Sequence, residues 1–214
     1  MTTYALRLWI PDRPGALGQV ASRIGSVGGD VVGIDILERG AGQAIDELLI
    51  LLPDPSRLDL LVAEVTQVDG VAIEDVRPAT PVVDDALTAA ALLVEAKSLQ
   101  QMLEVFCAET ALALRADWAV VLDRETVRSE ATVGEAPSAG WLHAFVEGVR
   151  HAGAAVGPDD VAWAELPGVP HDIVIGRQGR PMHARERSQL ELLARIAGAR
   201  AQDLGGADRL SRPA

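Results

Sequence analysis

The 214-residue sequence is poor in the residues that most often carry special chemistry. Cys107 is the only cysteine, which excludes an internal disulfide and a cysteine-rich zinc site. The four histidines lack the H-x-x-x-H spacing of a metal site, and neither a P-loop nor a G-x-S-x-G nucleophile motif occurs. We therefore expect no metal, no cofactor and no catalytic residue, and a role that is not enzymatic.

Long hydrophobic runs and an excess of basic charge are also missing. No apolar run approaches the roughly 18 to 20 residues of a membrane span, and the N-terminus lacks the cationic and apolar regions of a secretory signal. We expect a cytoplasmic protein without a membrane partner. A net charge of −12 argues against nucleic acid as a partner, because phosphates attract Lys and Arg. Lys97 is the only lysine beside 18 arginines, a bias typical of a GC-rich bacterial genome.

Regular apolar patterning is what the first part of the sequence does contain. From Gly15 onward apolar residues recur at helical spacing, and Gly28-Gly29 ends this helix. Ser56 and Asp59 have the spacing of a capping box, which opens a second helix. The predicted strands span residues 4–10, 31–37, 44–52 and 71–76. The order β-α-β-β-α-β predicts a ferredoxin-like α+β fold, with a four-stranded antiparallel sheet and both helices on one face.

The second part follows a proline-containing linker, which we place at residues 78–83. One long helix is predicted from Asp84 to about Arg115, and its apolar stripe from Leu92 to Ala113 either packs on the domain's own sheet or pairs with another chain. The other predicted elements are strands at 118–122, 127–133, 161–166 and 172–176 and helices at about 138–152 and 184–204. This half is α+β with a central antiparallel sheet, and residues 205–214 are expected to form a flexible tail.

The run Asp12-Arg13-Pro14-Gly15-Ala16-Leu17, between the first strand and the first helix, resembles the signature of ACT domains. The resemblance continues through Gly28-Gly29-Asp30-Val31-Val32 and covers about residues 3 to 77, so we assign residues 1–77 to an ACT-like domain. Such domains typically bind an amino acid or a similar small metabolite where two copies meet, and they regulate rather than catalyse. The resemblance implies an amino-acid ligand, a homodimer and a regulated protein partner.

The residues of this run suit a ligand that carries a carboxylate. A helix that begins at Pro14 or Gly15 leaves the backbone N–H groups of Ala16 and Leu17 unpaired. Together with the helix dipole, these groups favour a carboxylate by roughly 0.3 to 1 kcal/mol per charge. Asp12 is then placed to accept a hydrogen bond from an α-ammonium group.

By resemblance, the start of the second strand of a partner chain closes the other side of this site. Ligand-binding members of the family often carry an amide side chain there, whereas this sequence has Val31-Val32. This difference indicates an apolar amino acid, or one held mainly by backbone groups. The candidate ligand-binding residues are Asp12, Arg13, Pro14, Gly15, Ala16, Leu17, Asp30, Val31 and Val32.

The order of elements in residues 84–204 is similar to that of GAF domains, with Gly179-Arg180-Pro181 ahead of a final helix that opens with Ala184-Arg185-Glu186-Arg187. GAF domains are small-molecule sensor and dimerisation modules. This copy has no cyclic-nucleotide signature, and Cys107 lies inside the predicted first helix, where an ordinary packed thiol is expected. We expect a GAF-like domain without a ligand pocket.

Other functions stay open beside the ligand-binding regulator. The Asp-Arg-Pro-Gly run is also a good strand-to-helix turn, so the chain could serve as a dimerisation scaffold without a ligand. A small hydrolase would need His143 or His171 to meet a carboxylate in a pocket. Acidic pairs such as Asp46-Glu47 are typical of caps and turns. An anion or an acidic partner would fit the basic cluster beside His183, which consists of Arg177, Arg180, Arg185 and Arg187.

Overall fold

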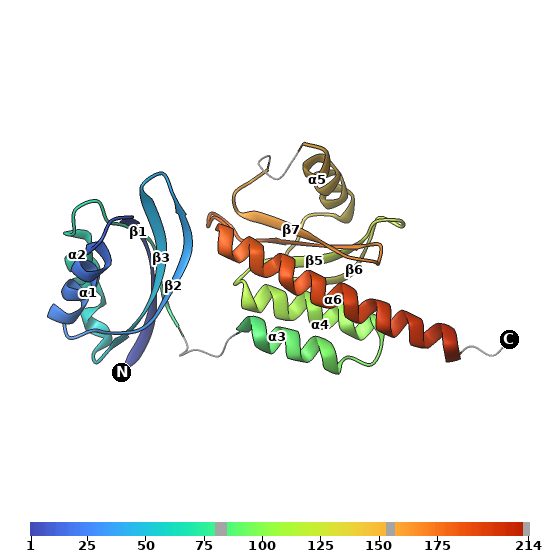
Figure 1. Ribbon diagram of the computed structural model, residues 1–214, viewed down its shortest axis with the longest axis horizontal. Helices are drawn as coiled ribbons and strands as arrows, with labels where there is room; N and C mark the ends of the chain where they lie inside the picture. The colour runs from blue at the N-terminus through green and yellow to red at the C-terminus, as the bar shows by residue number, and fades with distance from the viewer. Residues whose placement is uncertain (80–84, 153–156, 212–214) are drawn as a thin grey trace. The chain divides into compact units, whose positions relative to one another are not determined.

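The computed structural model describes residues 1–79, 85–152 and 157–211, and the chain divides into two compact units, Met1–Val82 and Val83–Ala214 (Figure 1). Each unit has its own hydrophobic core and its own antiparallel four-stranded sheet, so the α+β class is confirmed. None of the helices in the described ranges is both long and apolar enough to cross a bilayer.

In the first unit, two helices cover one face of the sheet (Figure 1). Its elements are β1 (Thr2–Pro11), α1 (Ala16–Ser26), β2 (Asp30–Gly40), β3 (Gln43–Leu52), the 3-10 turn η1 (Pro55–Arg57), α2 (Leu58–Thr66) and β4 (Ala72–Pro78). The strands lie in the order β2-β3-β1-β4, and each neighbouring pair is antiparallel. The edge strands of this sheet are therefore β2 and β4.

The core of this unit follows from simple alternation along its strands. Every second residue of β1, from Tyr4 to Ile10, points to the helices and packs against apolar residues of α1 and α2 such as Val20 and Leu61. Helix α1 ends as predicted, because Gly28 adopts φ +80° and the N–H of Gly29 donates to the Ile24 carbonyl at 3.0 Å.

The second unit places helices on both faces of its sheet. Its elements are α3 (Asp85–Glu95), α4 (Leu99–Ala113), β5 (Trp118–Asp123), β6 (Arg128–Val133), α5 (Ala139–Ala152), β7 (Val161–Leu166), β8 (His171–Gly176) and α6 (Ala184–Ser211). The strand order is β6-β5-β8-β7, again with antiparallel neighbours. One face packs on α3, α4 and α6 around Phe106, and the other packs on α5 around Val146. Cys107 lies buried in α4, where burial raises its pKa to about 11.

The single long helix predicted from Asp84 to Arg115 is wrong, because the chain forms two helices there. Ser98 lies in an extended conformation and its hydroxyl accepts a hydrogen bond from the N–H of Gln101 at 3.2 Å. The Gln101 side chain in turn accepts from the N–H of Lys97 at 3.0 Å. This reciprocal cap starts α4 anew, so the stripe from Leu92 to Ala113 does not run along one helix.

Three predicted boundaries also need correction. The linker was placed at 78–83, but β4 includes Pro78 and the N–H of Ala79 still donates to the Thr3 carbonyl; residues 80–83 lie outside the described ranges, as does Asp84. Ser56 does not cap α2, because Asp54 accepts from the N–H of Ser56 and forms the separate turn η1. The expected tail is helical through Ser211, and only residues 212–214 are not described.

Candidate functional site

The run predicted to bind a ligand forms the connection from β1 to α1. The N–H of Asp12 donates to the Gly42 carbonyl at 2.9 Å, which ties this loop to the turn between β2 and β3. Gly15 adopts φ +89° immediately before α1, a conformation that side chains with a Cβ rarely adopt. A Cβ at Gly15 would meet nothing within 4 Å, so the backbone at the start of α1 is open on this side.

The first turn of α1 has fewer unpaired backbone N–H groups than the sequence indicates. The prediction that the N–H of Ala16 is unpaired is wrong, because it donates to the Arg13 carbonyl at 3.2 Å in a tight turn. In the described part of the chain, the N–H groups of Leu17 and Gly18 have no backbone acceptor. The helix has no side-chain cap and no acidic residue in its first turn. No side chain of the first turn itself therefore offsets the positive end of the helix dipole.

The second half of the predicted site lies at the opposite end of the same sheet. Asp30, at the start of β2, pairs with Leu51, whereas Pro11, next to the Asp12 loop, pairs with Gln43. Eight residues of β3 separate the two positions, which is about 27 Å along a strand. A single copy therefore brings Asp12–Leu17 together but leaves Asp30–Val32 at a distance.

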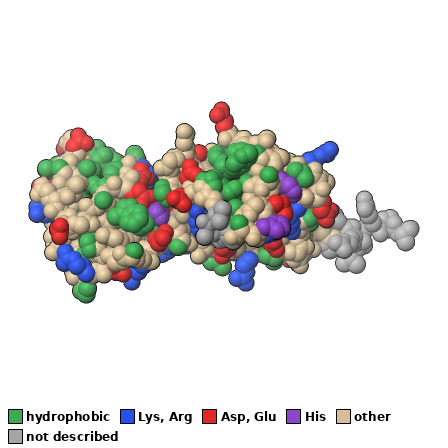
Figure 2. All heavy atoms as spheres, turned by 90° about the horizontal axis from the view of Figure 1, so that it is seen from above, with side chains coloured by type: hydrophobic (Ala, Val, Ile, Leu, Met, Phe, Trp, Pro, Cys, Tyr) green, Lys and Arg blue, Asp and Glu red, His purple; other side chains and the backbone are tan. Residues whose placement is uncertain are grey.

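The strand that carries Asp30–Val32 is an exposed edge. Within the described residues β2 pairs only with β3, so its outer backbone groups have no strand partner. Three of its apolar side chains are strongly exposed, namely Val32 at 47%, Ile34 at 49% and Ile36 at 38%. Hydrophobic side chains also reach the surface among charged ones on the face drawn in Figure 2. An unpaired edge with apolar side chains is a typical site of strand addition.

A buried carboxylate lies near the Asp12 loop, and the sequence did not indicate it. Asp46 belongs to β3 and not to the cap or turn predicted for the pair Asp46-Glu47. It is 5% exposed, on the sheet face that the helices cover, and its Oδ1 has no hydrogen-bond partner in the described ranges. Burial raises the pKa of Asp46, Arg39 lowers it, and the negative charge of Asp12 raises it.

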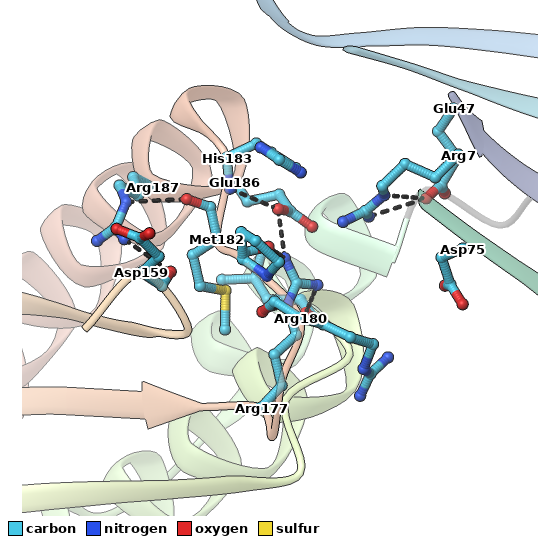
Figure 3. A network of polar contacts seen from close by, with 12 residues as sticks. Arg7, Glu47, Asp75, Asp159, Arg177, Arg180, Met182, His183, Glu186 and Arg187 are labelled. Atoms are coloured by element: carbon cyan, nitrogen blue, oxygen red, sulfur yellow. Dashed lines mark hydrogen bonds and ion pairs between the residues drawn. The ribbon is translucent and has the colours of Figure 1, made fainter. Parts of the chain in front are cut away.

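Glu47, the neighbour of Asp46, points to the other face of the sheet and accepts hydrogen bonds from two arginines. Arg7 donates to its Oε2 at 2.9 Å (Figure 3). Arg77 donates to both of its carboxylate oxygens at 2.8 Å. Arg77 also bonds Asp75 at 3.0 Å. Burial by itself would raise the pKa of Glu47, but the two arginines lower it below its usual range. This network neutralises its own charges, which indicates a structural role.

The arginine cluster of the second unit also serves the chain's own structure. Arg177 is fully buried and donates to the carbonyls of Leu114, Arg180 and Pro181 and to the carboxylate of Glu186 (Figure 3). Arg187 donates to the carbonyls of Met182, Val161 and Asp159, and Arg180 pairs with Asp117 at 2.8 Å. These three arginines have internal partners, which argues against the anion site considered for this cluster.

The histidines lie in different environments. His171 is buried on β8, whereas His151 is exposed on α5. Asp123, opposite His171 in the sheet, uses Oδ1 to accept the N–H groups of Glu125 and Thr126. Among the described residues, no group of three or more His, Cys, Asp or Glu is arranged to hold a metal ion.

Comparisons with known proteins give weak structural similarity. No family model matches the chain, and no curated protein matches it significantly. The ACT domain of GTP pyrophosphokinase from Chlorobium tepidum is 19% identical at a TM-score of 0.30, over 36% of this chain and 97% of that one. The GAF domain of a putative sensor histidine kinase from Pseudomonas syringae pv. tomato is 12% identical at 0.38, over 59% of this chain and 88% of that one.

A third structure, an unknown protein from Galdieria sulphuraria, is 14% identical at a TM-score of 0.33. The match covers 45% of this chain and spans 64% of the length of the Galdieria chain. Weak similarity to an ACT domain and to a GAF domain is thus what these comparisons show.

Proposed function

We propose that the first unit is a non-catalytic regulatory module that binds an amino acid or a similar small metabolite between two copies of the chain. The observation that carries this proposal is the uncapped start of α1, where Leu17 and Gly18 offer backbone N–H groups beside the open backbone of Gly15. Backbone donors and a helix dipole at one point favour a carboxylate. The family signature in residues 12–17 supports the same role.

The edge strand β2 supports placing the site between two copies. When two β2 strands pair antiparallel about their middle, residues 30–32 of one copy lie beside residues 38–40 of the other. Gly40 and Pro11 both pair with Gln43, and Asp12 bonds to Gly42, so this end of β2 adjoins the Asp12 loop. Two-fold pairing therefore joins the two halves of the predicted site, which one copy keeps about 27 Å apart.

Such a site would regulate through the stability of the dimer. A ligand that contacts both copies binds the paired arrangement more tightly than the separate chains, and it shifts the population by that difference in affinity. The regulated protein partner would then respond to the change in the fraction of paired chains.

A scaffold without a ligand is the second candidate, and the exposed apolar side chains of β2 favour it. Burial of Val32, Ile34 and Ile36 would drive pairing by itself, at about 25 cal/mol per Å² of apolar surface. The two functions differ in their response to small molecules. We expect a few amino acids with apolar side chains, out of the twenty at about 10 mM, to raise the melting temperature of the full chain. A flat response over the whole panel would favour the scaffold.

The start of α1 can be tested with two variants of matched shape. Gly15→Asp places a negative charge at the positive end of α1, whereas Gly15→Asn has nearly the same volume and no charge. Both residues tolerate a positive φ better than other side chains do, so the backbone cost is similar. We expect Gly15→Asp to abolish the ligand-induced shift in melting temperature and Gly15→Asn to retain it. Equal shifts in both variants would place the carboxylate site elsewhere.

A further inference from the structure

We infer that Asp46 is the residue that binds the α-ammonium group of the ligand, a role that the sequence pattern assigned to Asp12. This inference rests on the proposed function, because it concerns the same site between two copies. It follows from the position of Asp46, from the absence of a hydrogen-bond partner for its Oδ1 among the described residues, and from the balance of charge around it.

At the position of Asp46, the alternation of buried residues along β3 predicts an apolar side chain. The neighbours at alternate positions of β3, Ala44 and Leu48, are buried, and Leu48 belongs to the core under α1 and α2. The residues directly opposite Asp46 are Leu8 on β1 and Ile36 on β2. Because facing residues of paired strands share a face, the carboxylate has apolar neighbours on both sides.

In the chain without ligand, the cost of burying the Asp46 carboxylate is only partly offset by Arg39. It is 5% exposed, and Oδ1 finds no donor among the described residues. A buried carboxylate oxygen without a hydrogen bond is costly, so such a group is rarely kept for stability alone. An ammonium group supplies both the donors and the positive charge that this oxygen lacks.

The charges near Asp46 complete the argument. The groups that act on it electrostatically are Arg39 of β2 and Asp12 of the loop before α1. The two carboxylates and one guanidinium leave an excess of one negative charge, which matches an ammonium group. Gln43, three residues before Asp46 on β3, pairs with Pro11, and Asp12 follows Pro11 in the loop that leads into α1, so Asp46 lies toward the end of the sheet that carries this loop. An α-amino acid carries both complementary charges on adjacent atoms.

The side chain of such an amino acid would be apolar. Ile36 lies opposite Asp46 on the edge strand and is 38% exposed, and Ile34, two residues earlier, is 49% exposed. Within the described residues, no strand covers them. We therefore take L-valine, L-leucine and L-isoleucine as the probes, each with the matching carboxylic acid that lacks the amino group.

The test is calorimetric titration of the full chain and of Asp46→Asn with each pair of probes. The expected result is that Asp46→Asn binds the amino acid at least about tenfold more weakly and binds the deaminated acid as the wild type does. Asp46→Glu, which keeps the charge, should recover part of the affinity for the amino acid. Thermal unfolding without ligand checks that each variant is folded, and we expect Asp46→Asn to melt at or above the wild-type temperature.

Two outcomes would overturn the role of Asp46 and leave the proposed function intact. Asp46→Asn could bind the amino acid as tightly as the wild type, or it could lose the amino acid and the deaminated acid equally, which would indicate a general distortion. Failure of the proposed function shows in the wild type itself, as absence of binding to all three amino acids, and the inference falls with it.

Discussion

At the scale of single residues, the buried ionisable side chains are the most informative feature of the chain. Asp46 and His171 are both buried, and each has an atom without a hydrogen-bond partner in the described ranges. Burial shifts their pKa values in opposite directions, since it disfavours the charged form of each group. The two residues therefore have opposite effects on the pH dependence of stability.

His171 should make the protein less stable in mild acid. Burial lowers the pKa of His171 below its usual 6.5, although Asp123 raises it in part. Below pH 6.5 the unfolded chain binds a proton at this residue before the folded chain does, so the free energy of unfolding falls until the lower folded pKa is passed. Urea unfolding at a series of pH values from about 7.5 to 5.5 should show that the free energy of unfolding falls less for His171→Gln than for the wild type.

The contribution of Asp46 has the opposite sign and is present in both of these proteins. Its raised pKa means that protonation favours the folded state, which opposes the loss caused by His171 as the pH falls toward 3.8. Subtracting the free energy of unfolding of His171→Gln from that of the wild type at each pH therefore cancels the contribution of Asp46. Parallel pH profiles for the two proteins would contradict the shift assigned to His171.

Part of the candidate site is predictable residue by residue, and part is not. The turn at Gly15 follows from its proline and glycine, because only a few backbone conformations fit them. Asp46 lies within the strand predicted at residues 44–52, but it was missed because an adjacent acidic pair is common in turns. Both faces of that strand carry apolar residues, so the sequence does not show which face is buried. The bond from Ala16 to Arg13 depends on how tightly the loop closes, which residue types do not determine.

At the scale of elements, the edge strand β2 has the clearest functional meaning. Its backbone has one strand partner in the described ranges, and Val32, Ile34 and Ile36 expose apolar surface along it. Soluble chains usually protect such an edge, so an open apolar edge indicates an interface.

Pairing through β2 can be tested with a charge on the strand and a control of equal exposure. Ile34 is 49% exposed on β2, and Leu60 is 51% exposed on α2. Ile34→Lys should convert the dimer to a monomer, because the pairing would bury an ammonium group, whereas Leu60→Lys should leave the dimer unchanged. Sedimentation velocity over a range of protein concentrations measures both, and an unaltered dimer in Ile34→Lys would exclude this interface.

The elements themselves were largely predictable from apolar periodicity, because the spacing of buried residues differs between strands and helices. The break between α3 and α4 was missed because the apolar steps continue across it, from Ala96 to Leu99 and on to Leu103. The sequence did contain the necessary pattern: Ser98 and Gln101 form a serine-x-x-glutamine cap. Local capping overrode the longer periodic pattern there.

At the scale of the whole molecule, the proposed function makes binding and self-association a single equilibrium. In the proposed site the residues that contact the ligand come from two copies, so the ligand and the second copy would each increase the affinity for the other by the same factor. This reciprocity holds whatever the identity of the ligand.

The linkage predicts that the apparent affinity for the ligand depends on protein concentration. Titrations at about 5 μM and about 500 μM protein should give a lower apparent dissociation constant at the higher concentration, where more chains are paired. Ile34→Lys should bind weakly at both concentrations. An affinity that is independent of concentration in a wild type that remains partly monomeric would place the whole site within one copy.

The two edge strands of the first sheet also bear on how far this sheet can extend. β2 shifts register against β3 near Val31 and again near Ile36, and in the proposed two-fold pairing the β2 edge of each copy is covered by that of the other. The other edge of this sheet is β4, whose pairing with β1 is itself irregular and which ends at Pro78, a residue without an N–H to donate. If β2 pairs as proposed, we therefore expect this sheet to extend over two copies and no further, which would protect its exposed apolar edge from open-ended strand addition.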